Sequence, residues 1–224
     1  LRSLVGSEMC IRDRYGLIAI ILTLIIISGE IDLSIASMIA LTAVIFGTAY
    51  NAGFGMPISM FIALFSGTLC GLFNGILVTQ LQIPSIILTI GTLTLYRGIA
   101  QSLASDFSLG GYPSWFIGID YRYIGIVPIP VIIFTVFAIV VGFFLSSTIY
   151  GKQLYLIGTN PQTAKYSGIK VDRIKLLLFT LSGLVCGIAG VLTTSRLAVA
   201  RFNMATGAEL EIVLMVMLGL SLIH

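Results

Sequence analysis

The chain has 224 residues, of which 58% are apolar or aromatic, and its charged residues are 12 basic and 9 acidic. A soluble domain has about a quarter charged residues. The 9% found here, with a mean hydropathy of +1.09, cannot cover the surface of a soluble globular enzyme. Residues 33–96 contain no Asp, Glu, Lys or Arg, and one membrane crossing takes about 20 residues of helix. The sequence therefore predicts an all-α fold, a polytopic transmembrane helical bundle.

The two ends of the chain differ from its centre. Residues 1–14 are rich in charge, lack helical or strand periodicity, and resemble a translated sequencing adapter, as do residues 221–224. We expect non-native tails at 1–14 and 221–224 and a membrane domain at 15–220, with a native polar N-terminus as the alternative. Because this domain starts and stops inside apolar segments, we expect a fragment truncated at both ends.

Seven apolar segments follow one another along the chain, separated by Gly, Asn, Gln and Pro where turns are expected. They lie at 15–28, 33–50, 57–79, 83–104, 126–148 and 176–195, with the last opening at 208. The loop at 149–175 carries five basic residues against Asp172, whereas the loop at 105–125 carries Arg122 against Asp106 and Asp120. The positive-inside rule places the first loop in the cytoplasm and the second outside.

Small residues recur every fourth position on two of these segments. They are Ala63, Gly67, Gly71 and Gly75 on the first, and Gly183, Gly187, Cys186 and Gly190 on the second. Such spacing predicts closely packed helix seams, because lipid supplies no hydrophobic drive for helix association. The segments 66–79 and 182–194 also resemble one another and run in opposite directions in the expected topology. Inverted repeats are common in transporters, so this pattern indicates transport.

Several polar residues interrupt the apolar segments and are candidates for a solute path. Glu30, Asp32 and Ser34 lie between the first two segments, where Asp32 or Ser34 is expected to cap the following helix. Direct contact with a polyhydroxylated solute is the alternative. Glu209 is expected in the first turn of a helix, together with Glu211. Asn74 and Arg97 must face protein or a water-filled cavity rather than lipid.

The basic loop contains definite start and stop signals for a short helix. Asn160 is a typical N-cap, Pro161 suits the first helical position, and Gly168 can adopt a left-handed stop after residues 162–167. Asp172 is then expected to cap the helix that re-enters the membrane. We interpret the short helix as a docking element for another protein, with an interfacial helix resting on lipid headgroups as the alternative.

Enzymatic chemistry has little support in the sequence. The single histidine is the last residue, His224, so we expect no catalytic triad and no metal site within the fold. No G-x-x-x-x-G-K-[ST] phosphate loop occurs, so we expect no cofactor in this chain, and ATP, if it is used, binds to another chain.

Five segments together resemble the permease subunits of bacterial ABC importers for monosaccharides, a group that includes ribose, xylose, rhamnose and autoinducer importers. They are GEIDLSIASMIALTAVIFG (29–47), GLFNGILVTQLQIPSIILTIGTLTLYRGIA (71–100), YGKQLYLIGTNPQTAKYSGIKVDRIK (150–175), LSGLVCGIAGVLTTSR (181–196) and ATGAELEIVLMVMLG (205–219). Three blocks, EIDLS (30–34), TLYRGIA (94–100) and RLAVARFNMATGAELE (196–211), together most resemble rhamnose permeases, followed by autoinducer permeases. Two departures are the start inside an early membrane helix and SLIH in place of the family's glycine-rich block.

The resemblance implies a helical permease domain at 15–220 that pairs with a second permease, identical or different, around a central path. It also implies a periplasmic sugar-binding protein and a cytoplasmic ABC ATPase subunit as partners. The ATPase-coupling loop of the family falls on Gly158, Asn160, Pro161, Ala164, Ser167 and Gly168. The candidate translocation path comprises Glu30, Asp32, Ser34, Asn74, Arg97 and Glu209.

Our leading hypothesis is a non-catalytic, multi-pass subunit of the bacterial inner membrane that moves a monosaccharide, with a rhamnose-like sugar favoured, from periplasm to cytoplasm. Its expected contacts are protein partners and membrane lipid, without nucleic acid. Alternatives within transport are an autoinducer permease and a branched-chain amino-acid permease. A further alternative is an ion-coupled carrier that uses Glu30, Asp32 or Glu209 as proton sites.

Overall fold

The computed structural model describes residues 2–105, 107–117, 119, 123–124 and 127–221. Ten helices lie in this part of the chain: α1 (Arg2–Ile27), α2 (Ile35–Asn51), α3 (Met56–Thr79), α4 (Ser85–Ala104), α5 (Ser114–Ile117), α6 (Ile129–Ser147), α7 (Ile149–Thr159), α8 (Pro161–Tyr166), α9 (Val171–Leu197) and α10 (Ala208–Ser221). Two short strands, β1 (Tyr123–Ile124) and β2 (Val127–Pro128), form an antiparallel pair. The predicted all-α bundle is therefore confirmed, with this small hairpin as an addition.

Each of the seven predicted apolar segments coincides with a helix. Among the described residues, α3, α4 and α9 are long and apolar enough to cross a membrane, and α6 with α7 qualifies as one span bent by 76°. The apolar part of α1 and the whole of α2 are shorter than a full crossing. Because α1 begins at Arg2, a helix also covers residues 2–14, whose assignment as a non-native tail stays a prediction.

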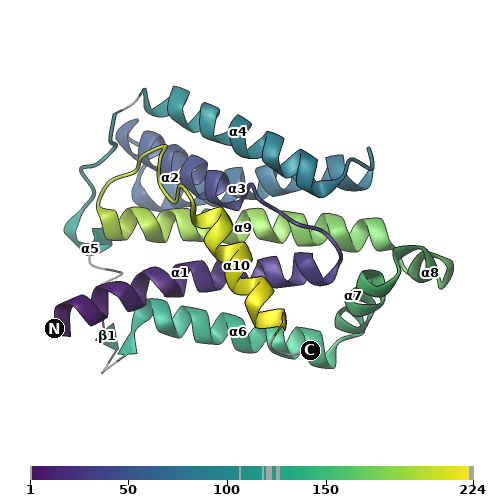
Figure 1. Ribbon diagram of the computed structural model, residues 1–224. Coiled ribbons are helices and arrows are strands. Elements are labelled where there is room, and N and C mark those ends of the chain that lie inside the picture. Colours follow the sequence, from purple (N-terminus) through teal and green to yellow (C-terminus); the bar gives the residue numbers. More distant parts are fainter. Residues whose placement is uncertain (1, 106, 118, 120–122, 125–126, 222–224) are drawn as a thin grey trace.

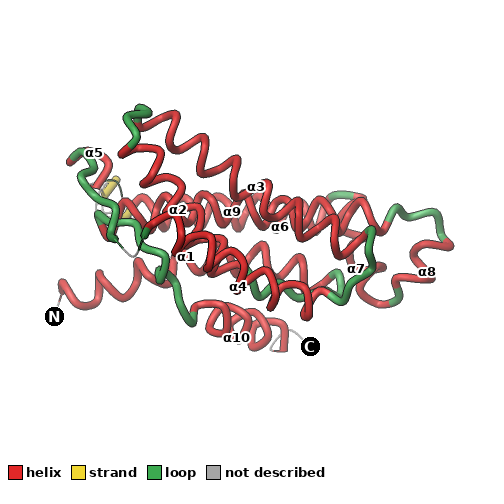
Figure 2. Tube along the Cα trace, turned by 90° about the horizontal axis from the view of Figure 1, so that it is seen from above, coloured by secondary structure: helices red, strands yellow, loops and turns green. Residues whose placement is uncertain are grey.

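The helices lie alongside one another with their connections gathered at two opposite ends (Figure 1). Helices α7 and α8 lie at one end, and α5 and β1 lie at the other, as Figure 2 also shows for α5, α7 and α8. The two loops predicted to face opposite sides of the membrane are thus at opposite ends of the bundle. Asp106, Asp120 and Arg122, which entered that prediction, lie outside the described residues.

Helix α2 is the centre of the packing. Its buried residues lie all around the helix and include Ile35, Met38 and Phe46. The buried residues of α2 form part of three apolar clusters, one of them shared with Ile18 and Leu22 of α1. Helices α3, α4 and α9 all contact α2. A helix that is apolar on every side is expected to be enclosed by other helices, and α2 meets that expectation.

The glycine seams of α3 and α9 pack directly against each other. A Cβ atom on Gly71 would collide with the backbone carbonyl of Phe179, and one on Gly183 would collide with that of Gly67. Further along, Gly75 approaches Phe179 and Gly67 approaches Gly187, so the two helices run antiparallel. The predicted seam is confirmed. Close backbone approach supplies the dispersion contacts that hold helices together in lipid.

We expect Gly71→Ala to weaken the bundle by about 1–3 kcal/mol, because the added methyl meets backbone that cannot rotate away. Gly91→Ala on α4 is the matched control, since nothing lies within 4 Å of the position that its Cβ would take. Unfolding of the protein in bicelles by SDS titration gives both free energies. Equal unfolding midpoints for the two variants would show that α3 and α9 do not pack along this seam.

Candidate functional site

The chain breaks its helical path between α1 and α2 and turns back into the bundle (Figure 1). Helix α1 ends as Ser28 Oγ donates to the carbonyl of Ile25, and Gly29 adopts a left-handed conformation with φ of 82°. The backbone N–H of Glu30 also donates to the Ile25 carbonyl, at 3.1 Å. Residues 28–34 then lead to the start of α2. We call them the break segment.

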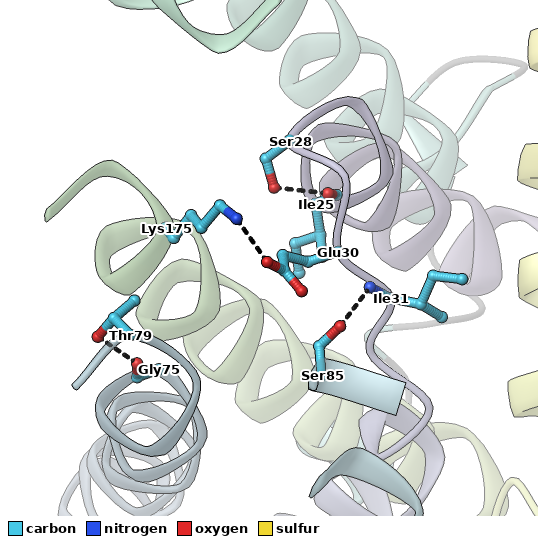
Figure 3. A network of polar contacts seen from close by, with 8 residues as sticks. All are labelled: Ile25, Ser28, Glu30, Ile31, Gly75, Thr79, Ser85 and Lys175. Atoms are coloured by element: carbon cyan, nitrogen blue, oxygen red, sulfur yellow. Dashed lines mark hydrogen bonds and ion pairs between the residues drawn. The ribbon is translucent and has the colours of Figure 1, made fainter. Parts of the chain in front are cut away.

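An ion pair holds the outer part of the break segment. Glu30 Oε1 lies 2.5 Å from Nζ of Lys175, five residues into α9, and the two side chains are only 16% and 13% exposed (Figure 3). The N–H of Ile31 donates to Ser85 Oγ, at 3.1 Å, at the start of α4. A partly buried pair is screened less than a surface pair, so this contact ties the break segment to α9.

A buried polar network holds the inner part of the break segment. Asp32 Oδ1 accepts hydrogen bonds from the N–H and the hydroxyl of Ser34, at 2.9 and 2.7 Å, and Oδ2 accepts from Ser182 Oγ of α9, at 3.4 Å. Asn74 Nδ2 of α3 donates to Ser34 Oγ, at 2.8 Å, and the Tyr96 hydroxyl of α4 donates to Asn74 Oδ1, also at 2.8 Å. We call these five residues the interior network.

The interior network is buried inside the bundle. Asp32, Ser34, Asn74 and Ser182 are fully buried, and Tyr96 is 4% exposed. Ser182 lies seven positions beyond Lys175 on α9, so Asp32 contacts α9 about 10 Å deeper than Glu30 does. Helix α2 therefore begins within the bundle rather than at its end. Transporters place discontinuous helices of this kind at membrane depth.

The structure corrects part of the capping prediction. Ser34 occupies the N-cap position of α2, but its hydroxyl makes no cap hydrogen bond because it is engaged by Asp32 and Asn74. Asp32 does accept a backbone N–H, that of Ser34 itself, and its carboxylate lies beside the positive end of the helix dipole. Asp172 is not the cap of α9, because α9 begins at Val171 and Asp172 lies inside the first turn.

A second polar group lies apart from the interior network. Arg97 of α4 donates through Nη1 to the hydroxyl of Thr206, in the turns that precede α10. Its Nε and Nη2 atoms, and Oε2 of Glu209, are buried without a hydrogen-bond partner among the described residues. Glu209 and Glu211 lie in the first turn of α10, as predicted. Buried polar atoms are normally paired, so these unpaired donors and this unpaired acceptor are exceptions within the described bundle.

The basic loop contains the short helix that the sequence predicts. Asn160 Oδ1 accepts from the N–H groups of Gln162 and Thr163, at 3.0 and 3.1 Å, and Pro161 opens α8. Gly168 has a φ of 82°, the left-handed stop that was expected. Ser167 is the C-cap of α8, and its hydroxyl donates back to the carbonyl of Thr163.

Two contacts anchor this loop to the membrane helices. Ala164 is buried with Ile157 and Val171 in a small apolar cluster, so α8 is held against α7 and the start of α9. A Cβ atom on Gly158 would collide with the carbonyl of Ile27, so α7 rests on the end of α1 next to the break segment. The outer face of α8 is exposed at the end of the molecule (Figure 2).

The candidate path residues thus fall into three places: Glu30 at the ion pair with Lys175, Asp32, Ser34 and Asn74 in the interior network, and Arg97 and Glu209 near the start of α10. Sequence reasoning missed their partners Lys175, Tyr96, Ser182 and Thr206. A polar side chain within an apolar helix was a signal for Tyr96 and Ser182. Among the described residues, no group of His, Cys, Asp or Glu side chains could hold a metal ion.

We expect Tyr96→Phe to lower the free energy of unfolding by about 1–3 kcal/mol, because Asn74 Oδ1 would lose its donor inside the bundle. Tyr155→Phe on α7 is the matched control, since that ring is 53% exposed and its change is expected to stay within about 0.5 kcal/mol. SDS unfolding in bicelles measures both. A Tyr96→Phe protein as stable as the parent would contradict the network.

Comparisons with known proteins agree on the permease components of transport systems. The family described as branched-chain amino acid transport system / permease component matches residues 14–223. The autoinducer 2 import system permease protein LsrD of Escherichia coli strain SMS-3-5 / SECEC is 34% identical over 212 residues, and LsrD of Shigella flexneri matches equally. Both alignments cover 91% of this chain, which spans 64% of the length of those relatives.

No solved structure matches the chain. The predicted multi-pass location in the inner membrane is supported by the family match together with the long apolar helices. The matched family covers almost all of the chain, including the break segment, the basic loop and the start of α10. The chain therefore belongs to the family of branched-chain amino acid transport system permease components.

Proposed function

We propose that this chain is the membrane-spanning permease subunit of an ATP-binding-cassette importer that moves a monosaccharide from the periplasm to the cytoplasm, with a rhamnose-like sugar favoured. Its partners are a cytoplasmic ABC ATPase, a periplasmic sugar-binding protein and a second permease, identical or different. The single observation that carries the proposal is the well-delimited helix α8, which is held by Asn160 and Gly168 and leaves its outer face exposed.

The basic loop is the coupling element in this proposal. A partner that grips α8 would also move α7 and the start of α9, because Ala164 packs with Ile157 and Val171. Movement of α7 reaches the end of α1 through the contact of Gly158 with Ile27, and movement of α9 reaches the break segment through Lys175 and Glu30. Closure of the ATPase would thereby be transmitted to the membrane helices as an alternating-access movement.

Arg97 and Glu209 are the solute-contacting residues in this proposal. Their unpaired guanidinium nitrogens and carboxylate oxygen can respectively donate to and accept from the hydroxyl groups of a sugar. The other four candidate residues do not contact the solute in this proposal, because their polar atoms already bind one another, Lys175, Ser182 or Tyr96. They are Glu30, Asp32, Ser34 and Asn74. They hold the helices that border the path.

Two other solutes have a specific observation in their favour. The similar proteins are named for autoinducer 2 import, which makes autoinducer 2 the second candidate. The family description names branched-chain amino acids, and a guanidinium with a carboxylate could also hold the two charges of an amino acid. Measured uptake of a sugar, autoinducer 2 and a branched-chain amino acid decides among the three solutes.

For the coupling loop, we expect Gly168→Val to lower ATP-driven uptake about tenfold, because a β-branched residue is strained at a φ of 82° and the end of α8 would shift. Gly168→Asn is the matched control, since Asn tolerates the left-handed region, and it should stay within about twofold of the parent. Vesicles containing the permease, its ATPase and its binding protein give uptake per ATP hydrolysed. If the Gly168→Val variant transports as much solute per ATP as the parent, α8 is not the coupling element.

For the solute contacts, we expect Arg97→Gln to lower the uptake of labelled rhamnose about tenfold, because a charged donor to the solute is lost. Arg201→Gln removes the same charge from an exposed position outside the proposed contacts and serves as control. Labelled leucine and autoinducer 2 are measured in the same vesicles. Uptake of leucine without sugar uptake would assign the chain to amino-acid transport, and uptake that follows the proton gradient without ATP would assign it to the carriers.

A further inference from the structure

A large apolar groove is lined by residues of α1, α6, α7 and α9. Its volume is about 890 Å³, and it lies between α6 and α9 with α1 beneath it. Figure 1 shows α1 between these two helices, which lie on either side of it. Apolar side chains from α6 and α9 line the groove, among them Phe137, Val140, Leu181 and Ile188. Val140 is 58% exposed and Leu181 is 37% exposed, so the groove is open.

The end of the groove next to the basic loop is polar and positively charged. Lys170 and Arg173 line it there, together with Tyr150 and Gln153. Both basic side chains are exposed, and neither takes part in an ion pair within the described residues. Their neighbours along the chain differ, since Lys165 pairs with Asp172 and Lys175 pairs with Glu30. The groove therefore combines an apolar trough with two uncompensated positive charges at one end.

We propose that this groove binds one phospholipid with an anionic headgroup from the inner leaflet of the membrane. The headgroup phosphate lies between Lys170 and Arg173, and one acyl chain lies along the trough between α6 and α9. Arg173 and Ile188 are 15 residues apart on α9, or about 22 Å, and one leaflet of hydrocarbon is about 15 Å deep. The trough thus spans the headgroup level and the whole depth of one leaflet.

Charge complementarity selects this occupant. The basic loop lies on the cytoplasmic side in the topology argued above, and the cytoplasmic leaflet is the anionic one. Basic pockets between membrane helices on that side are a known setting for acidic headgroups. An apolar helix of a second protein would fill the trough but would leave the two charges unpaired. Gly168, which ends the coupling element, also lines the groove, so a bound lipid would contact the moving part of the loop.

The test measures lipid binding to the purified permease by native mass spectrometry, with dioleoyl phosphatidylglycerol and dioleoyl phosphatidylcholine as probes. We expect tighter binding of phosphatidylglycerol at a stoichiometry of one. The double variant K170Q/R173Q should bind it about 25-fold more weakly, at about fivefold for each basic side chain. The double variant K152Q/K165Q removes the same charge outside the groove and should stay within about threefold.

A second pair of variants tests the trough itself. Leu181→Trp fills the groove and should lower phosphatidylglycerol binding at least tenfold, whereas Leu210→Trp on the exposed side of α10 should not. Equal binding of the two lipids, or unchanged binding by K170Q/R173Q, would overturn the proposal. Displacement of the lipid by soluble glycerol phosphate would also overturn it and would reveal a phosphate site. A parent protein that retains no lipid would overturn it as well and would point to a protein segment as the occupant.

Discussion

The structure depends on how a carboxylate is accommodated in the middle of an apolar bundle. Asp32 is fully buried, and each of its oxygens must find a donor or cost several kcal/mol. Ser34 and Ser182 supply these donors, and Asn74 and Tyr96 complete the network from two further helices. The position at which α2 begins is therefore determined by contacts with α3, α4 and α9 together, rather than by the hydropathy of α2.

The glycine seam makes that arrangement possible. Helices α3 and α9 approach closely enough that carbonyls of each occupy the space of a Cβ on the other, and α2 packs against both. Thr42 of α2 adds a polar contact within the same junction, because its hydroxyl lies 3.4 Å from the carbonyl of Cys186 on α9. A bulkier seam would move α9 away from α2 and separate Ser182 from Asp32. The close approach of α3 and α9 thus accounts both for the packing of these helices and for the hydrogen bonding of Asp32.

Hydropathy and turn chemistry predict much of this molecule, because they depend on neighbouring residues. The seven apolar segments, the Asn160 cap and the Gly168 stop all follow from local patterns, and all are present. The ion pair of Glu30 with Lys175 joins residues 145 apart in the chain, and no local pattern reports it. The Ser34 hydroxyl was expected at a cap for the same reason: no local pattern reports its contact with Asn74, 40 residues away.

Among the described residues, helix α9 makes polar contacts at several depths along the bundle. Asp172 pairs with Lys165 of α8, Lys175 pairs with Glu30, Ser182 reaches Asp32, and Ser195 donates to the carbonyl of Phe116 in α5. A helix of 27 residues is about 40 Å long, and its own hydrogen bonds make it stiff along its axis. A displacement that enters at α8 therefore need not pass from side chain to side chain. In the proposed coupling, it would reach the interior network and the opposite end of the bundle as a rigid movement of α9, which is the kind of movement that alternating access requires.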